Sequence, residues 1–146
     1  MKKQQRMLVS ALVAVIYLAI PALAKSLPNK PLKTIAPDLI IETAEQGEFL
    51  DDPADPLHFS ATNVVPHRNR YLFGWRLKVK TVRQKILVQE RSIDGRGKQG
   101  VPGYFKPKDG YLFHATDLVE TIPSGKYTRT VFVENQPVKT FSYEIK

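Results

Sequence analysis

Residues 71–81 show the clearest alternation of apolar and polar side chains in the chain. Glycine, arginine and lysine separate four large apolar residues, which are Phe73, Trp75, Leu77 and Val79. A period of two residues is typical of a β-strand with one buried face and one solvent-exposed face. We therefore predict a strand here, with Trp75 in the core.

Two further strands are expected around this segment. The first runs from residue 38 to about residue 48, where an apolar Leu-Ile-Ile sequence opens it. The second, at 85–93, is apolar at its centre and follows residues 71–81 after only three residues, 82–84. This spacing predicts a hairpin between the two segments.

The C-terminal part of the chain continues the strand pattern after a loop at 94–110 that is rich in glycine and proline. Residues 111–119 predict a strand, and residues 127–134 and 138–145 predict a hairpin with its turn at 135–137. Beyond residue 24, no window of 11 or more residues has a helical period. Short strands joined by regular turns favour an all-β antiparallel sandwich of about seven strands.

Residues 1–24 have the features of a cleavable secretory signal peptide. A cationic start precedes an apolar stretch at 7–20, and small residues at 21–24 form an Ala-x-Ala-like cleavage site. A membrane span needs about 20 apolar residues, so a removable signal is favoured over a membrane anchor. We expect cleavage after Ala24, no later membrane span, and a periplasmic or secreted protein.

Cleavage at that point would leave a basic domain. Three of the 22 Lys and Arg residues leave with the signal while all 14 Asp and Glu residues remain, so 122 residues carry a net charge near +5. We expect a proline-rich, flexible or extended lead-in at 25–37 and one domain at 38–146. The chain has no cysteine, which excludes thiol catalysis, disulfide exchange and cysteine-based zinc sites.

Three segments share a pattern with known domains. They are residues 73–77 (Phe-Gly-Trp-Arg-Leu), the turn at 122–127 (Ile-Pro-Ser-Gly-Lys-Tyr) and the hairpin at 131–145. Together they resemble the second half of small exported bacterial domains with an immunoglobulin-like or fibronectin-type-III-like sandwich. The resemblance implies a fold and a compartment, with no catalytic residue to carry over. The paired cysteines of antibody domains are missing.

The histidines and carboxylates do not form a recognisable metal motif. His58, His67 and His114 stand at long, irregular spacings, whereas metal ligands usually show short local spacings. Prolines separate the aspartates in 51–55, which favours an acidic turn over a calcium site. We expect no metal and no cofactor, and a periplasmic metal-binding protein or enzyme that uses the three histidines remains an alternative.

Catalytic motifs are also missing from the sequence. No Gly-x-Ser-x-Gly nucleophile motif is present, and Ser124 lies in a Pro-Ser-Gly turn. The glycine-rich sequence at 95–100 lacks the Ser or Thr after lysine that a phosphate-binding loop requires. We therefore expect a protein that is not an enzyme.

Two features could bind a partner. Aromatic and cationic residues interleave in the 94–110 loop, and a basic row follows the polar face of 71–81. The simpler interpretations are a solvated loop tip and the wet face of an antiparallel sheet. The candidate residues are Arg96, Lys98, Tyr104, Phe105, Lys106 and Lys108 in the loop, and Arg76, Lys78 and Lys80 on the strand.

These features predict a non-catalytic binding or accessory domain that recognises an envelope protein or an anionic glycan or lipid. Nucleic acid is disfavoured, because no aromatic residue shares the face of the basic row. The second alternative is a carbohydrate-binding sandwich, which predicts that Tyr104 and Phe105 are exposed and coplanar.

Overall fold

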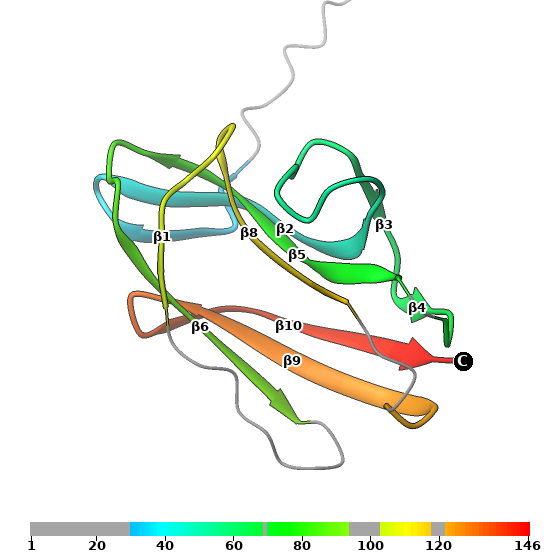
Figure 1. The fold of residues 1–146 in the computed structure, drawn as a ribbon. Coiled ribbons are helices and arrows are strands. Elements are labelled where there is room, and N and C mark those ends of the chain that lie inside the picture. Colours follow the sequence, from blue (N-terminus) through cyan, green and yellow to red (C-terminus); the bar gives the residue numbers. More distant parts are fainter. Residues whose placement is uncertain (1–29, 69, 94–102, 118–121) are drawn as a thin grey trace, which may run out of the picture.

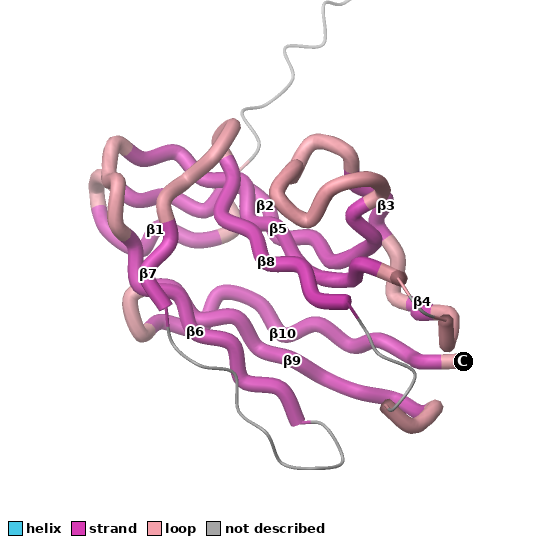
Figure 2. The backbone as a smooth tube through the Cα atoms, in the orientation of Figure 1, coloured by secondary structure: helices cyan, strands magenta, loops and turns pink. Residues whose placement is uncertain are grey.

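A computed structural model describes residues 30–68, 70–93, 103–117 and 122–146, and these ranges form two β-sheets packed face to face (Figures 1 and 2). The β5 sheet contains β1 (Lys33–Ala36), β2 (Leu39–Phe49), β3 (Phe59–Ala61), β5 (Leu72–Thr81) and β8 (Tyr111–Asp117). The β9 sheet contains β4 (Val64–Val65), β6 (Ile86–Ile93), β7 (Gly103–Phe105), β9 (Gly125–Val133) and β10 (Gln136–Ile145). In these ranges, no helix is long and apolar enough to cross a membrane.

The strand order explains which side chains meet. The β5 sheet runs β1-β2-β5-β8 with β3 also paired to β2, and the β9 sheet runs β4-β10-β9-β6-β7. Strand β4 pairs parallel to β10, whereas the other pairs are antiparallel. The all-β sandwich expected from the alternating pattern is confirmed.

The core lies between the two sheets. The alternation in residues 71–81 is confirmed, because Phe73, Trp75 and Leu77 are buried and Trp75 is only 1% exposed. Trp75 and Leu77 belong to a core cluster that includes Ile86 of β6 and Val131 of β9, and Phe73 belongs to a second cluster with Tyr127 of β9. Burial of each large apolar side chain contributes about 1.5–3 kcal/mol, so the core accounts for a fold without disulfides.

The predicted hairpin between residues 71–81 and 85–93 is wrong. Strand β5 pairs with β2 and β8, while β6 pairs with β7 and β9. The segment between β5 and β6 therefore crosses from one sheet to the other (Figure 1). Both strands bury alternate residues, and they pack face to face rather than edge to edge.

The lead-in contributes to the sandwich. Strand β1 lies within residues 25–37, for which neither helix nor sheet was expected, and it pairs with β2. Strand β1 lies between Pro31 and Pro37, so the prolines flank the strand and do not interrupt its pairing. The described residues hold ten strands instead of about seven, because β1, β3, β4 and β7 are short additions.

The C-terminal hairpin is confirmed, with a tighter turn than predicted. Strands β9 and β10 pair antiparallel along most of their length. The turn is formed by Glu134 and Asn135, whose φ angles of 48° and 62° match the two-residue type I′ turn favoured between twisted strands. Within the expected loop at 94–110, residues 103–105 form β7, and residues 94–102 lie outside the described ranges.

Side chains from the β5 sheet reach the edge of β10. The Lys33 amine donates to the Pro137 carbonyl at 2.6 Å, and the Gln46 amide donates to the Ser142 carbonyl at 2.6 Å. In return, the Gln136 amide donates to the Ile35 carbonyl at 3.3 Å. These bonds join the two sheets along the side of the sandwich where β1 and β2 approach β10.

Gly74 is a position where a larger residue should disrupt the sheet. A Cβ atom there would lie 1.9 Å from the backbone oxygen of His114 on β8. Gly74→Ala should therefore destabilise the fold by about 1–3 kcal/mol, the usual cost of overpacking, measured by urea unfolding. Gly103→Ala is the control, since a Cβ there would meet only the Phe105 ring at 3.4 Å. Equal stability of the two variants would contradict this view of the β5–β8 contact.

Candidate binding surface

The basic row predicted on β5 is largely neutralised. The Arg76 side chain is 16% exposed and pairs with Glu45 at 2.8 Å. Its guanidinium also donates to the Pro56 carbonyl and lies 4.2 Å from the centre of the Phe59 ring. Arg76 is thus a packed residue that joins β5 to the loop before β3.

The lysines of the same row are more open. Lys78 lies 3.6 Å from the Glu42 carboxylate on β2, and Lys80 is exposed. The β5 sheet therefore sets carboxylates beside two of the three predicted cations, which lowers the attraction of this face for an anionic partner.

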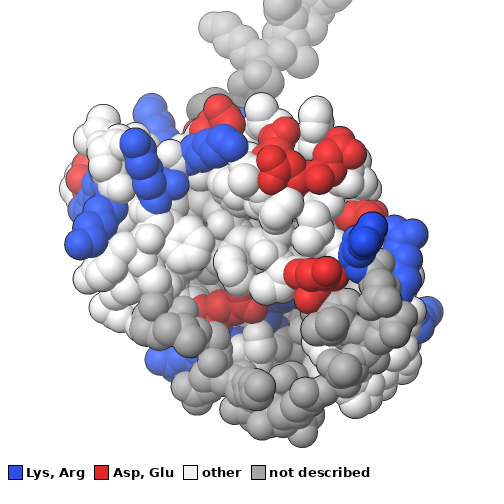
Figure 3. All heavy atoms as spheres, viewed as in Figure 1, with Lys and Arg blue, Asp and Glu red and all other residues white. Residues whose placement is uncertain are grey.

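The structure separates the loop candidates. Lys106 is exposed, and the Lys108 amine donates to the Ala54 carbonyl in the loop between β2 and β3. Arg96 and Lys98 lie outside the described residues. Figure 3 shows acidic side chains gathered over that loop, where Asp51 and its neighbouring aspartates stand.

The carbohydrate platform expected from Tyr104 and Phe105 is wrong. Tyr104 is 65% exposed, whereas Phe105 packs on the core with its ring 6.1 Å from Trp75. Adjacent residues of a strand point to opposite faces of the sheet. The two rings therefore lie on opposite sides of β7 and cannot form one coplanar surface.

Tyr104 instead joins an aromatic and cationic stripe on the outer side of the β9 sheet. The Lys85 amine lies 4.3 Å from the centre of the Tyr104 ring, and the Arg91 guanidinium lies 4.6 Å from the centre of the Phe132 ring. Tyr104 is paired with Leu87, and Phe132 with Gln89. Because these positions alternate with the buried residues of β6 and β9, both pairs face solvent. We call the surface formed by Lys85, Tyr104, Arg91, Phe132 and Lys126 the outer β9 stripe.

The cations of this stripe differ from those on β5. Lys85, Arg91 and Lys126 are exposed, and no carboxylate lies within 4.0 Å of them in the part of the chain that the structure describes. Glu144 stands opposite Lys126 in the β9–β10 register but pairs with Lys146 at 3.4 Å. The outer β9 stripe therefore keeps its positive charge available.

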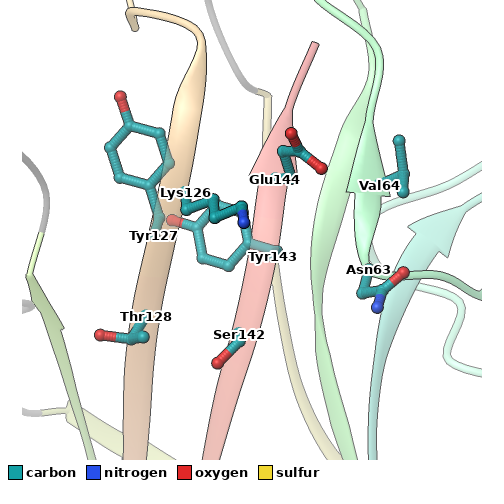
Figure 4. Close-up of a pocket in the computed structure, with 8 residues that line it drawn as sticks. All are labelled: Asn63, Val64, Lys126, Tyr127, Thr128, Ser142, Tyr143 and Glu144. Atoms are coloured by element: carbon teal, nitrogen blue, oxygen red, sulfur yellow. The ribbon is translucent and has the colours of Figure 1, made fainter.

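A pocket of about 390 Å³ opens at the Lys126 end of the stripe (Figure 4). In Figure 4, Lys126 extends from β9 toward Glu144 on β10, and Asn63 stands across from them. The volume falls in the range of about 300–1,000 Å³ typical of small-ligand sites. The lining includes Val64 and two tyrosines, and it offers an amine, a carboxylate, an amide and two hydroxyls from Lys126, Glu144, Asn63, Thr128 and Ser142.

The histidines have separate surroundings. His58 lies 3.5 Å from Asp51 and 3.2 Å from Asp55 in the acidic loop. The His67 backbone amide donates to the Lys146 carbonyl beside the C-terminus, and His114 lies opposite Trp75 on β8 with an exposed side chain. Among the described residues, no three His, Asp or Glu side chains are grouped to hold a metal ion.

The most strongly perturbed group is Glu90, between the two sheets. Its carboxylate accepts hydrogen bonds from the Trp75 indole at 2.8 Å and the Ser92 hydroxyl at 3.0 Å. His114 lies 3.7 Å from the carboxylate and Arg129 lies 3.6 Å from it. Burial raises the pKa of Glu90, but His114, Arg129, Trp75 and Ser92 together outweigh burial and lower the pKa to about 2.

Arg129 completes this inter-sheet centre. It is only 4% exposed, and its guanidinium lies 4.7 Å from the ring centres of both Phe73 and Tyr143. A buried ion pair of this kind costs about 3–5 kcal/mol when one partner is removed. The arrangement stabilises the packing of the sheets and keeps Glu90 ionised.

Sequence reasoning missed Glu90, Arg129, Arg91, Phe132 and Lys126. For Arg129 and Glu90, the alternation of buried and exposed residues in β9 and β6 contained the signal. Arg129 stands in register with buried Val131, and Glu90 stands in register with buried Val88. A charged residue in each buried register predicts a pair, whereas the partner strands cannot be derived from the alternation alone.

Comparisons with known structures agree with the sandwich. An immunoglobulin-like protein from Pseudomonas aeruginosa matches with a TM-score of 0.51 and 15% identity over 74% of this chain and 96% of its own. An alkylpurine DNA glycosylase from Pseudomonas fluorescens, bound to DNA with an abasic site analog, matches with a TM-score of 0.34 and 15% identity over 57% of this chain and 28% of its own. The second score is too low to support an argument. The fold is immunoglobulin-like.

Comparison with protein-family models and with curated proteins gives no match. The structural similarity therefore describes the fold alone and does not indicate a function.

The lowered pKa of Glu90 predicts that the folded protein loses stability in acid. Its pKa is lowered from 4.5 to about 2, so its contribution is complete above pH 4.5 and is lost as the pH falls toward 2. The shift corresponds to about 3 kcal/mol of unfolding free energy. Urea unfolding of wild type and Glu90→Gln between pH 2 and pH 7 should show a stability difference that shrinks in acid.

The control for this comparison is Glu42→Gln, which removes an exposed carboxylate paired with Lys78. Its effect should be small at every pH. If Glu90→Gln followed the same pH profile as the control, the inter-sheet ion pair would not contribute as described.

Proposed function

We propose that this chain is an exported, non-catalytic binding domain that recognises an anionic component of the cell envelope through the outer β9 stripe. The observation that carries the proposal is the presence of three exposed cations without carboxylate partners among the described residues, beside two aromatic rings. Immunoglobulin-like sandwiches are rigid scaffolds on which such surfaces are held in place.

The two outer sheet faces support this choice by contrast. On the β5 sheet, Arg76 and Lys78 are each matched by a carboxylate on β2. On the β9 sheet, no described carboxylate pairs with Lys85 or Arg91, and Glu144 opposite Lys126 pairs with Lys146 instead. Tyr104 is the most exposed aromatic residue described. Unmatched cations attract and orient an anionic partner, so the stripe is the face that an anionic ligand would approach.

The inter-sheet carboxylate supports a non-catalytic function. A general acid or base needs a pKa near the working pH, whereas that of Glu90 is lowered to about 2. Its oxygens are already occupied by Trp75 and Ser92. Glu90 therefore fits a role in holding the sheets together better than a role in proton transfer.

Export is the second part of the proposal. The cationic start, the apolar stretch and the small residues before Lys25 fit a secretory signal, and a chain without cysteine needs no disulfide formation outside the cytoplasm. Expression of the full chain in a Gram-negative bacterium, followed by fractionation and mass spectrometry, should give a periplasmic or secreted protein that begins at Lys25. A cytoplasmic protein that retains residues 1–24 would contradict this.

The binding face can be tested with charge-matched variants. Lys85→Gln, Arg91→Gln and Lys126→Gln combined should weaken binding to immobilised dextran sulfate at low salt by about a hundredfold, since each cation contributes about 1 kcal/mol near an anionic surface. The control combines Lys78→Gln, Lys80→Gln and Lys108→Gln, which removes the same charge from β5 and from the loop that contacts Ala54. Binding is measured by titration at two salt concentrations.

The outcomes separate a binding face from bulk charge. A large loss in the first variant and a small loss in the control would support the proposal. Equal losses in both would mean that attraction follows net charge, and the outer β9 stripe would then have no special role.

A further inference from the structure

The outer β9 stripe extends along the strands rather than across them. Lys85 precedes β6, Arg91 is paired with Thr130, and Lys126 lies four residues further along β9 in the same direction. With about 3.4 Å for each residue of an antiparallel strand, the stripe is about 34 Å long. Such a surface suits an extended ligand that carries charges at intervals.

Several hydroxyls lie between the cations, together with the Gln89 amide and the Glu144 carboxylate. Thr130 and Thr140 share a hydrogen bond of 2.8 Å on this face, and Thr128 and Ser142 line the pocket at the Lys126 end. A hydroxyl donates and accepts hydrogen bonds, as the hydroxyls of a sugar do. The pocket adds the Asn63 amide, which has both capacities as well.

The aromatic rings of the stripe also lie on the outer face of the β9 sheet. Tyr104 and Phe132 belong to strands on opposite sides of β6, and each ring is held beneath a cation. Each ring presents an apolar surface beside a cation. A sugar ring has a similar mixture of apolar and polar surface, so the two surfaces fit each other.

We propose that the outer β9 stripe binds an acidic polysaccharide in an extended form, with one sugar unit in the pocket beside Lys126. This inference rests on the proposed function and names the class of its ligand. The cations bind carboxylates of the polymer, the hydroxyls and Asn63 bind its hydroxyls, and Tyr104 packs against a ring.

Other anionic partners fit the surface less well. An extended acidic peptide usually adds to the edge of a sheet through backbone hydrogen bonds, whereas the stripe lies on a face. A lipid surface is usually bound by several exposed apolar side chains that insert beside cations, whereas Tyr104 is the only stripe residue among the exposed large hydrophobic side chains of the described ranges.

The test compares three anionic probes against the mature chain, residues 25–146, by calorimetry at low salt. The probes are a hexamer of galacturonic acid, poly-glutamate of similar charge, and vesicles of phosphatidylglycerol and phosphatidylcholine. We expect the uronate oligomer to bind most tightly. Tyr104→Ala should weaken its binding by about threefold to tenfold, and Tyr104→Phe, which keeps the ring, should restore most of the affinity.

The pocket is tested separately by Thr128→Val combined with Ser142→Ala. These changes remove two hydroxyls from the exposed side of β9 and β10 while preserving the charge of the face. They should weaken binding of the uronate oligomer and leave binding to dextran sulfate unchanged. Thermal unfolding of each variant confirms that the sandwich is intact.

The two proposals fail in different ways. If poly-glutamate or vesicles bind as tightly as the uronate oligomer and still depend on Lys85, Arg91 and Lys126, the polysaccharide inference is overturned and the binding function stands. If no probe depends on these cations, the proposed function itself is overturned.

Discussion

The partly buried carboxylate of Glu90, between the two sheets, is the constraint on which the arrangement of the sandwich depends. An ionised group between two apolar sheets is costly unless donors surround it. The structure supplies Trp75 from β5, His114 from β8 and Arg129 from β9. Because the donors come from both sheets, only one relative position of the sheets satisfies the carboxylate.

The contacts around Glu90 join the two sheets, as a disulfide does in antibody domains. There, a disulfide joins the sheets beside a core tryptophan. This chain has no cysteine, and the tryptophan of β5 donates instead to a carboxylate of the opposite sheet. The connection responds to pH rather than to redox conditions.

The outer faces of the two sheets differ in charge. The β5 sheet pairs its cations with glutamates of β2 and uses Arg76 as a packing residue beside Phe59. The β9 sheet carries threonine, serine and aromatic residues between its cations. The same fold thus presents one nearly neutral face and one basic face.

The alternation of residues was enough to predict the fold class, the burial of Trp75 and the C-terminal hairpin, because each depends on local pattern. Pairing partners were not predictable in the same way. The buried faces of β5 and β6 have the same period whether the strands pair or pack face to face. The candidate residues Arg76 and Phe105 were read as exposed for a related reason, since their packing depends on Phe59 and Trp75 from distant strands.

The polar contacts along β10 have a consequence for how molecules of this protein behave at high concentration. A strand at the edge of a sheet offers unpaired backbone groups to other chains, and proteins block such edges to avoid aggregation. Here, Lys33 and Gln46 occupy two carbonyls of β10, and β4 covers its far end. The edge of β10 beside the pocket that Lys126 lines is thereby closed to strand exchange between copies, so a high protein concentration need not seed fibrils there.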